Sequence, residues 1–127
     1  MKTLILFSIV GAPALACLCP TPKVAKSAAA AGTIFTAKVQ TVTKDRSGIW
    51  LDVTVVPDRV YKGIAKAGES LSIQTASLES SCGYPFKTGE SYLIYATERN
   101  GHLTTGLCSG DKKMSDAASD LAWLASH

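Results

Sequence analysis

Two cysteines stand one residue apart directly after a run of small residues, a pattern that could leave a cysteine with a free amino group at the chain terminus. Ala14–Ala16 has the small-x-small form that signal peptidase cuts after, and a Cys-Leu-Cys run begins at Cys17. Cleavage between them would leave Cys17 with a free α-amino group. Such a group titrates near pH ~8, so a useful fraction of it is uncharged at neutral pH. The remaining cysteines, Cys82 and Cys108, are then candidates to hold this terminus in place.

The first sixteen residues have the pattern of a secretory signal. Lys2 supplies a positive charge, Leu4–Val10 is an apolar run, and Gly11–Pro13 breaks that run before the cleavage site. The run is far shorter than the roughly 20 residues that span a bilayer, and no other stretch is long or apolar enough. We therefore expect residues 1–16 to be removed, and residues 17–127 to form one small domain, secreted to the extracellular space or the periplasm.

Four cysteines in an exported chain of 127 residues predict two disulfides. A bridge between Cys17 and Cys19 would close a very small, strained ring. Each of these two cysteines is therefore expected to pair with Cys82 or Cys108, and the spacing leaves open which takes which partner. Either arrangement closes long loops, each worth roughly 4 kcal/mol in the chain-entropy model.

The elements that must position this terminus are mostly strands. Thr21–Ala31 is alanine-rich and suits a short helix, with Thr21 as its cap and Pro22 at its first position. Pro57 interrupts a long apolar alternation and predicts a bulge or bend, and Asn100-Gly101 predicts a hairpin. The expected strands are Thr33–Val42, Ile49–Tyr61, Ser70–Thr75, Ser91–Thr97 and His102–Leu107.

A second helix is expected near the carboxyl end, over Ser115–Ser126. Ala117, Ala118, Leu121 and Leu124 form its apolar stripe, and Ser115 or Asp116 can cap it. Five short strands with a long bent second strand and a helix at each end predict a mainly β fold, a five-stranded OB-fold barrel. A sandwich is the alternative, but five strands are few for one.

The sequence argues against an enzyme and against a resident cofactor. His102 is expected on the surface of a hairpin, and no H-E-x-x-H pair or phosphate-binding loop is present. The cysteine spacing differs from that of zinc knuckles. Asp116 and Asp120 lie four apart and are interpreted as a solvated helix edge. The net charge is +3 and the basic residues are scattered, with only Lys112-Lys113 adjacent, so no nucleic-acid partner is expected.

Two motifs together resemble a known family. Glu-Ser-Ser-Cys-Gly-Tyr at residues 79–84 and His-Leu-Thr-Thr-Gly-Leu-Cys-Ser at residues 102–109, combined with a Cys-x-Cys start, are similar to the inhibitory domain of the tissue inhibitors of metalloproteinases. Thr33–Val39 looks like the first barrel strand of the wider netrin-like group. The similarity covers nearly all of residues 17–127.

The resemblance implies an OB-fold barrel with disulfides Cys17–Cys82 and Cys19–Cys108. It also implies a secreted, monomeric inhibitor whose partner is a zinc metalloendopeptidase. In that family the amine and carbonyl of the first cysteine, here Cys17, chelate the protease's catalytic zinc and displace its water. Leu18 would enter the S1′ pocket of the protease. The other implied contact residues are Cys19, Pro20, Glu79, Ser80, Ser81 and Cys82.

The chain also departs from the family. It lacks the third disulfide of this domain and the second cysteine-rich domain, and Leu18 stands where a small hydroxyl residue is more common. The alternative function is a netrin-like binding or adhesion module that inhibits no protease. Leu15-Ala16-Cys17 is close to a lipoprotein site, which would anchor such a module by lipid on Cys17. Against that anchor, Ala14 replaces the larger aliphatic residue such sites prefer, and lipidation would leave an odd number of cysteines.

Overall fold

The computed structural model describes residues 17–21 and 23–127. The expected signal segment, residues 1–16, lies outside the described residues, and so does Pro22, the expected first residue of the helix. In chain order the elements are α1 (Val24–Ala30), β1 (Thr33–Lys44), β2 (Trp50–Lys62), β3 (Leu71–Ala76), the 3-10 turn η2 (Glu79–Ser81), β4 (Ser91–Arg99), β5 (His102–Thr104), β6 (Lys112–Lys113), the 3-10 turn η3 (Met114–Asp116) and α2 (Ala118–Ala125).

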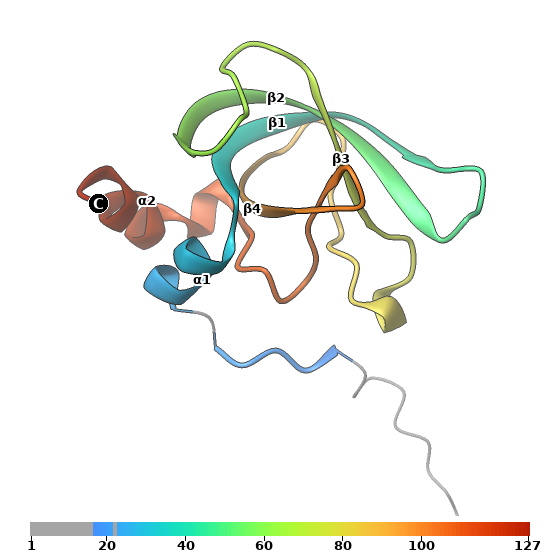
Figure 1. Ribbon diagram of the computed structural model, residues 1–127, viewed down its shortest axis with the longest axis horizontal. Coiled ribbons are helices and arrows are strands. Elements are labelled where there is room, and N and C mark those ends of the chain that lie inside the picture. Colours follow the sequence, from blue (N-terminus) through green and yellow to red (C-terminus); the bar gives the residue numbers. More distant parts are fainter. Residues whose placement is uncertain (1–16, 22) are drawn as a thin grey trace, which may run out of the picture.

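Five of the strands close into a barrel (Figure 1). β1 pairs antiparallel with β2 on one side and with β4 on the other, and β2 pairs with β3. A short parallel pairing of β3 with β5, and the β4–β5 hairpin, complete the ring. The predicted mainly β, five-stranded barrel with a helix near each end is confirmed. The two-residue strand β6, which pairs with β4, was not predicted because it is too short to show a periodic pattern.

A bulge at Pro57 lets β2 bend around the barrel, as the sequence predicted. Thr36 is opposite Arg59 and Ala37 is opposite Pro57, so the register slips by one residue at Asp58. Proline has no N–H to donate to a ladder, which is why a bulge accommodates it. The bend allows β1 to pair with β2 along nearly its whole length while its first half also pairs with β4.

The core lies in two parts, one on each face of β4. Every residue from Tyr92 to Ala96 is buried, because alternate side chains enter the barrel or face the two helices. The barrel core contains Phe35, Ala37, Val39, Val53, Val55, Ala65, Ile73, Phe86, Tyr92, Ile94, Ala96 and Leu103. The helix-side core contains Ala31, Ile34, Leu93, Tyr95, Ala117 and Leu124. Both helices cover this second face (Figure 1).

The predicted helix boundaries need correction. α1 begins at Val24 with Lys23 at its N-cap position, so Thr21 is not the cap. The expected single helix over Ser115–Ser126 is instead the turn η3 followed by α2, and neither Ser115 nor Asp116 caps α2. Ala117 separates the two pieces with a non-helical backbone, and its side chain is fully buried in the helix-side core.

Candidate functional site

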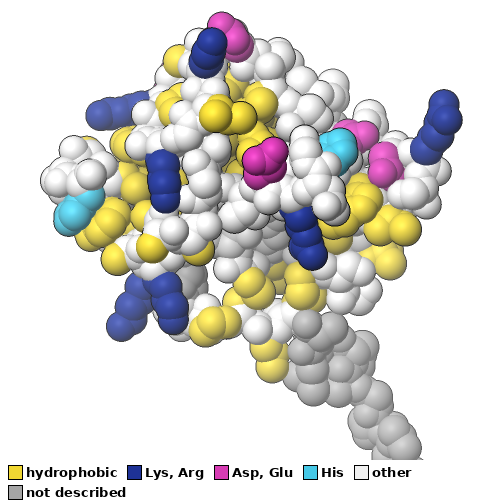
Figure 2. Space-filling model, viewed as in Figure 1, with side chains coloured by type: hydrophobic (Ala, Val, Ile, Leu, Met, Phe, Trp, Pro, Cys, Tyr) yellow, Lys and Arg dark blue, Asp and Glu magenta, His cyan; other side chains and the backbone are white. Residues whose placement is uncertain are grey.

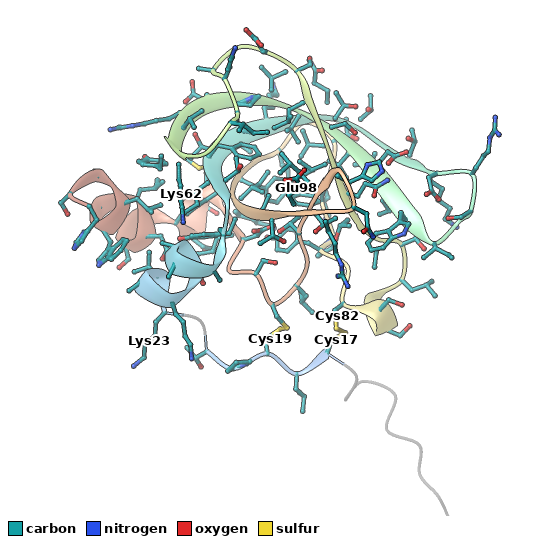
Figure 3. All side chains as sticks on the ribbon, in the orientation of Figure 1. Cys17, Cys19, Lys23, Lys62, Cys82 and Glu98 are labelled. Atoms are coloured by element: carbon teal, nitrogen blue, oxygen red, sulfur yellow. A yellow bond between two sulfur atoms is a disulfide. The ribbon has the colours of Figure 1, made fainter. Side chains whose placement is uncertain are left out.

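The segment from Cys17 to Pro20 lies across one end of the barrel and is fixed there by two disulfides (Figures 1 and 3). We call it the ridge. Cys17 is bonded to Cys82, with Cα atoms 5.3 Å apart, and Cys19 is bonded to Cys108, with Cα atoms 5.2 Å apart. This is the pairing that the family resemblance implied. The cysteine spacing alone could not choose it, because either arrangement was sterically open.

Leu18 projects from the ridge into solvent. Its side chain is 72% exposed, while the cysteines on either side are half-buried because their sulfurs are bonded to the barrel. Pro20 is also exposed and continues the ridge toward α1. A bulky apolar side chain is thus held in solvent between two covalent anchors.

Cys82 is held by the chain on both sides of it. The turn η2 precedes it, where the Ser81 N–H donates to the carbonyl of Leu78 (3.0 Å), and the Leu107 N–H donates to the Cys82 carbonyl (2.8 Å). Cys82 has φ +66°, a left-handed conformation that costs a non-glycine residue roughly 1–2 kcal/mol. Ser80 and Ser81 are exposed and directly precede Cys82, which is bonded to Cys17 of the ridge.

Gly83 explains part of the motif at residues 79–84. A Cβ atom at this position would lie 1.9 Å from the carbonyl oxygen of Ala76, so no other residue fits without moving the end of β3. The Tyr84 N–H then donates to the Thr75 side chain (2.8 Å). The glycine therefore lets the connector cross β3 closely enough for Cys82 to reach the ridge.

The second anchor sits in a loop that sequence reasoning missed. β5 ends at Thr104, whereas the strand was expected to continue to Leu107, and residues 105–111 form a loop that carries Cys108. We call it the Cys108 loop. Inside it, the Gly106 N–H donates to the Ser109 hydroxyl (3.1 Å). A Cβ atom on Gly106 would lie 2.8 Å from the Cys82 carbonyl oxygen, so the loop contacts both disulfide anchors.

Asp120 is buried, and its interpretation as part of a solvated helix edge was wrong. The Tyr95 hydroxyl donates to its Oδ2 (2.6 Å), and the Lys112 ammonium lies 3.1 Å from the same oxygen. Burial, and then the bond to Asp120, raise the pKa of the Tyr95 hydroxyl above its ordinary value. Asp116 is exposed, as expected. The spacing of the two acids could not reveal that one faces a buried tyrosine on β4.

Exposed apolar side chains occur on the segments that the two disulfides join. Three of the five large hydrophobic side chains that are exposed among the described residues belong to the ridge or to the segments that carry Cys82 and Cys108. Leu18 lies between the anchors, Leu107 is next to Cys108, and the Leu78 carbonyl accepts the η2 hydrogen bonds. We call these three residues, Leu18, Leu78 and Leu107, the apolar rim.

A hollow of about 260 Å³ lies behind the ridge. Both anchoring cysteines on the barrel, Cys82 and Cys108, line it, together with Trp50 and Arg99. It gives this end of the barrel an uneven, partly polar surface. On the face shown in Figure 2, lysine and arginine side chains are scattered at separate points.

The histidines lie apart from the ridge. His102 is exposed on β5, as predicted, and the ring of His127 stacks on that of Trp123 at a centroid distance of 3.9 Å. Within residues 17–21 and 23–127, no three or more His, Cys, Asp or Glu side chains gather in a way that could hold a metal ion. In the same residues, no helix is long and apolar enough to cross a membrane.

No protein-family model matches this chain, and no curated protein matches it either. The resemblance to the metalloproteinase inhibitors therefore depends on the quoted motifs alone. The fold and the two disulfides stand independently of it.

Proposed function

We propose that this protein, once cleaved before Cys17, inhibits secreted zinc metalloproteases by presenting the amine and carbonyl of Cys17 to the catalytic zinc. The observation that carries the proposal is the ridge itself: two disulfides fix Cys17 and Cys19 to the barrel, and Leu18 projects between them. In this proposal the mature protein is secreted and acts as a monomer.

The chemistry of a catalytic zinc suits such a ligand. These sites hold the metal with three protein ligands and keep a further position open for water or substrate. An amine and a carbonyl on one residue form a compact bidentate ligand that can displace that water. The two disulfides fix the ligand before it meets the protease, which reduces the loss of conformational entropy on binding.

The surroundings of the ridge favour a protein partner. Leu18 is mostly exposed to solvent and suits the apolar S1′ pocket of a metalloprotease. Pro20 continues the ridge, and the backbone of Glu79, with Ser80 and Ser81, lies along the chain that leads to Cys82. The apolar rim supplies further exposed hydrophobic surface, which in soluble proteins commonly marks an interaction site.

The competing hypothesis is a netrin-like binding module without inhibitory activity, in one form anchored by lipid on Cys17. The Cys17 sulfur is bonded to Cys82, and one sulfur cannot form both that disulfide and a thioether to lipid. The disulfide therefore favours the unlipidated form. The unanchored binding module differs from the inhibitor only in what it does with the Cys17 amine.

The decisive test compares two forms of the oxidised protein, one beginning at Cys17 and one extended by a single alanine. Each is titrated against a panel of secreted zinc metalloproteases. We expect stoichiometric inhibition by the first form and its loss in the second, because the extension moves the free amine away from the zinc. Intact mass and circular dichroism serve as controls that both forms are unlipidated, oxidised and folded.

Equal inhibition by the two forms would show that the amine is not the ligand. Absence of inhibition across the panel, with a free Cys17 amine verified, would favour the binding module.

A further inference from the structure

The Cys108 loop is closed at its base by three contacts, two with Tyr95 on β4 and one between its own first and last residues, Thr105 and Asp111. The Tyr95 N–H donates to Asp111 Oδ1 at 2.8 Å. The Thr105 Oγ1 lies 2.6 Å from Asp111 Oδ2 and 3.1 Å from the carbonyl oxygen of Tyr95. The next residue, Ala96, accepts a hydrogen bond from Gly32 on the β1 side. Because N–H and C=O groups alternate sides along a strand, both backbone groups of Tyr95 face the loop.

A count of hydrogens fixes the protonation state that satisfies all three contacts. The Tyr95 N–H supplies one hydrogen and the Thr105 hydroxyl supplies one, whereas an ionised carboxylate only accepts. If Asp111 is protonated, its Oδ2–H donates to Thr105, and the Thr105 hydroxyl donates to the Tyr95 carbonyl. If Asp111 is ionised, the single hydroxyl hydrogen of Thr105 cannot serve both the carboxylate and the Tyr95 carbonyl.

The surroundings of Asp111 also favour the neutral acid. Its side chain is buried, and burial raises the pKa of Asp111 to about 7, although the bonds from Thr105 and Tyr95 and the charge of Lys112 oppose this. The Lys112 ammonium is bonded to the Asp120 carboxylate. Tyr84 on the connector and Tyr95 on β4 also interact electrostatically with Asp111, and burial raises the pKa of both hydroxyls, so both are neutral near pH 7.

The hydrogen bonds among Tyr95, Thr105 and Asp111 can affect the ridge through two connections. Cys108, in the middle of the loop, is bonded to Cys19. The Leu107 N–H donates to the carbonyl of Cys82, which is bonded to Cys17. A loop that loosens at its base therefore releases constraint from both ends of the Cys17–Cys19 segment.

We propose that Asp111 is a positioning residue whose protonated carboxyl closes the Cys108 loop and holds the ridge, and that loss of this proton loosens both. The titration of Asp111 and the amide exchange of the loop can be measured whether or not the protein inhibits a protease. The effect of the loop on a protease rests on the proposed function.

The loop is tested by NMR on the oxidised protein across roughly pH 5 to 9, a range that brackets the physiological values. The readouts are the carboxyl carbon shift of Asp111 and the hydrogen exchange of the amides of residues 106–110. The key variant is Asp111→Asn, whose amide oxygen can accept from Tyr95 and whose NH₂ can donate to Thr105, as the neutral acid does. Asp116→Asn, an exposed acid nearby, is the matched control.

We expect Asp111 to titrate near pH 7 and, above it, loop amides in the native sequence to exchange about tenfold or more faster than in Asp111→Asn at the same pH. Asp116→Asn should behave as the native sequence does. Titration of Asp111 below about pH 5, its ordinary range, would overturn the proposal. Amide exchange rates in the loop that do not change as Asp111 titrates would also overturn it. The native-sequence measurement stands even if Asp111→Asn does not fold.

With an inhibited protease in hand, the pH profile of inhibition separates the two groups. Deprotonation of the Cys17 amine should strengthen inhibition equally in the native sequence and Asp111→Asn, so their ratio isolates the loop. Above about pH 7 we expect the native sequence to inhibit the protease more weakly than Asp111→Asn does. A constant ratio would overturn the link to the ridge. If no protease is inhibited, the proposed function fails while the NMR result still decides the loop.

Discussion

Among single residues, Leu18 has the position that most clearly favours contact with a partner protein. It is covalently flanked by two anchored cysteines and remains 72% exposed. Burial of a leucine side chain in a partner's pocket is worth about 1.5–3 kcal/mol, which is ten- to a hundredfold in affinity. A side chain held outward in this way contributes to binding without contributing to the barrel.

We therefore predict that Leu18→Ser weakens inhibition about tenfold or more while the free energy of unfolding changes by less than about 0.5 kcal/mol. The reason is that the lost contacts are with the protease only. Inhibition constants and denaturant melts measure the two effects. Ile64→Ser is the matched control, because Ile64 is 74% exposed and lies in the β2–β3 connection, which carries neither disulfide.

Equal losses of inhibition in Leu18→Ser and Ile64→Ser would show that Leu18 has no special contact. A large loss of stability in Leu18→Ser would mean that it packs against the protein after all.

At the same scale, some roles could be predicted from residue type and others could not. The exposure of His102 and the turn at Asn100-Gly101 were predicted, since both depend on local sequence; Asn100 and Gly101 have φ +53° and +83°. The role of Gly83 depends on the distant Ala76 carbonyl, and the burial of Asp120 depends on Tyr95. Contacts of this kind between distant elements leave no local pattern.

At the scale of elements, the contact between β4 and the Cys108 loop predicts a pH dependence of stability. The folded pKa of Asp111 is raised from 3.8 to about 7, so between these values the folded state binds more protons than the unfolded state. The stability that Asp111 contributes is full below about pH 4 and falls as pH rises to about 7, by at most about 1.4 kcal/mol per pH unit. Above that range it is constant.

The measurement is the free energy of unfolding of the native sequence and of Asp111→Asn at a series of pH values. We expect the free energy of unfolding of Asp111→Asn to rise relative to that of the native sequence from about pH 4 to about pH 7. Above that range the difference should stay constant. Taking the difference cancels other groups, such as Asp45, whose pKa is lowered chiefly by the bond from Ser47. A difference that is flat from acid to neutral pH, or of opposite sign, would contradict the raised pKa.

Elements were predictable where the signal lay within them. The alternating strands and the proline bulge in β2 follow from side-chain period and from the missing N–H of Pro57. The early end of β5 and the break between η3 and α2 do not. Both are imposed by packing on β4, through Thr105 in the first case and through Ala117 in the second.

At the scale of the whole molecule, the two disulfides should resemble each other in stability and differ in function. They join residues 65 and 89 positions apart, a difference worth only about 0.3 kcal/mol in the chain-entropy model. We predict that replacing either pair by serines lowers the free energy of unfolding by a similar amount, up to about 4 kcal/mol. Removing Cys17–Cys82 should abolish inhibition, whereas removing Cys19–Cys108 should weaken it.

Denaturant unfolding and inhibition assays on the two double variants, under conditions in which both are folded, measure these effects. Full inhibition by the variant that lacks the Cys17–Cys82 bridge would mean that the position of the amine is not set by that disulfide.

The overall architecture was more predictable than the site it carries. Strand number, the long bent β2 and the helices near both ends were sufficient to predict a five-stranded barrel. The disulfide pairing came from a resemblance, since the four cysteines allowed more than one arrangement. The hydrogen bonds that join Thr105 and Asp111 to each other and to β4 were not predicted, because they form only when the barrel brings β4 against the loop.

The long separation of the paired cysteines has a consequence in time. Synthesis proceeds from the amino end, so Cys17 cannot meet Cys82, nor Cys19 meet Cys108, until most of the barrel has been made. The segment from Cys17 to Cys19 is thus the first part of the described chain to be synthesised, and its disulfides form only late in synthesis or after it. Until then its thiols are open to exchange with other thiols, and whatever assists their oxidation determines when this protein is complete.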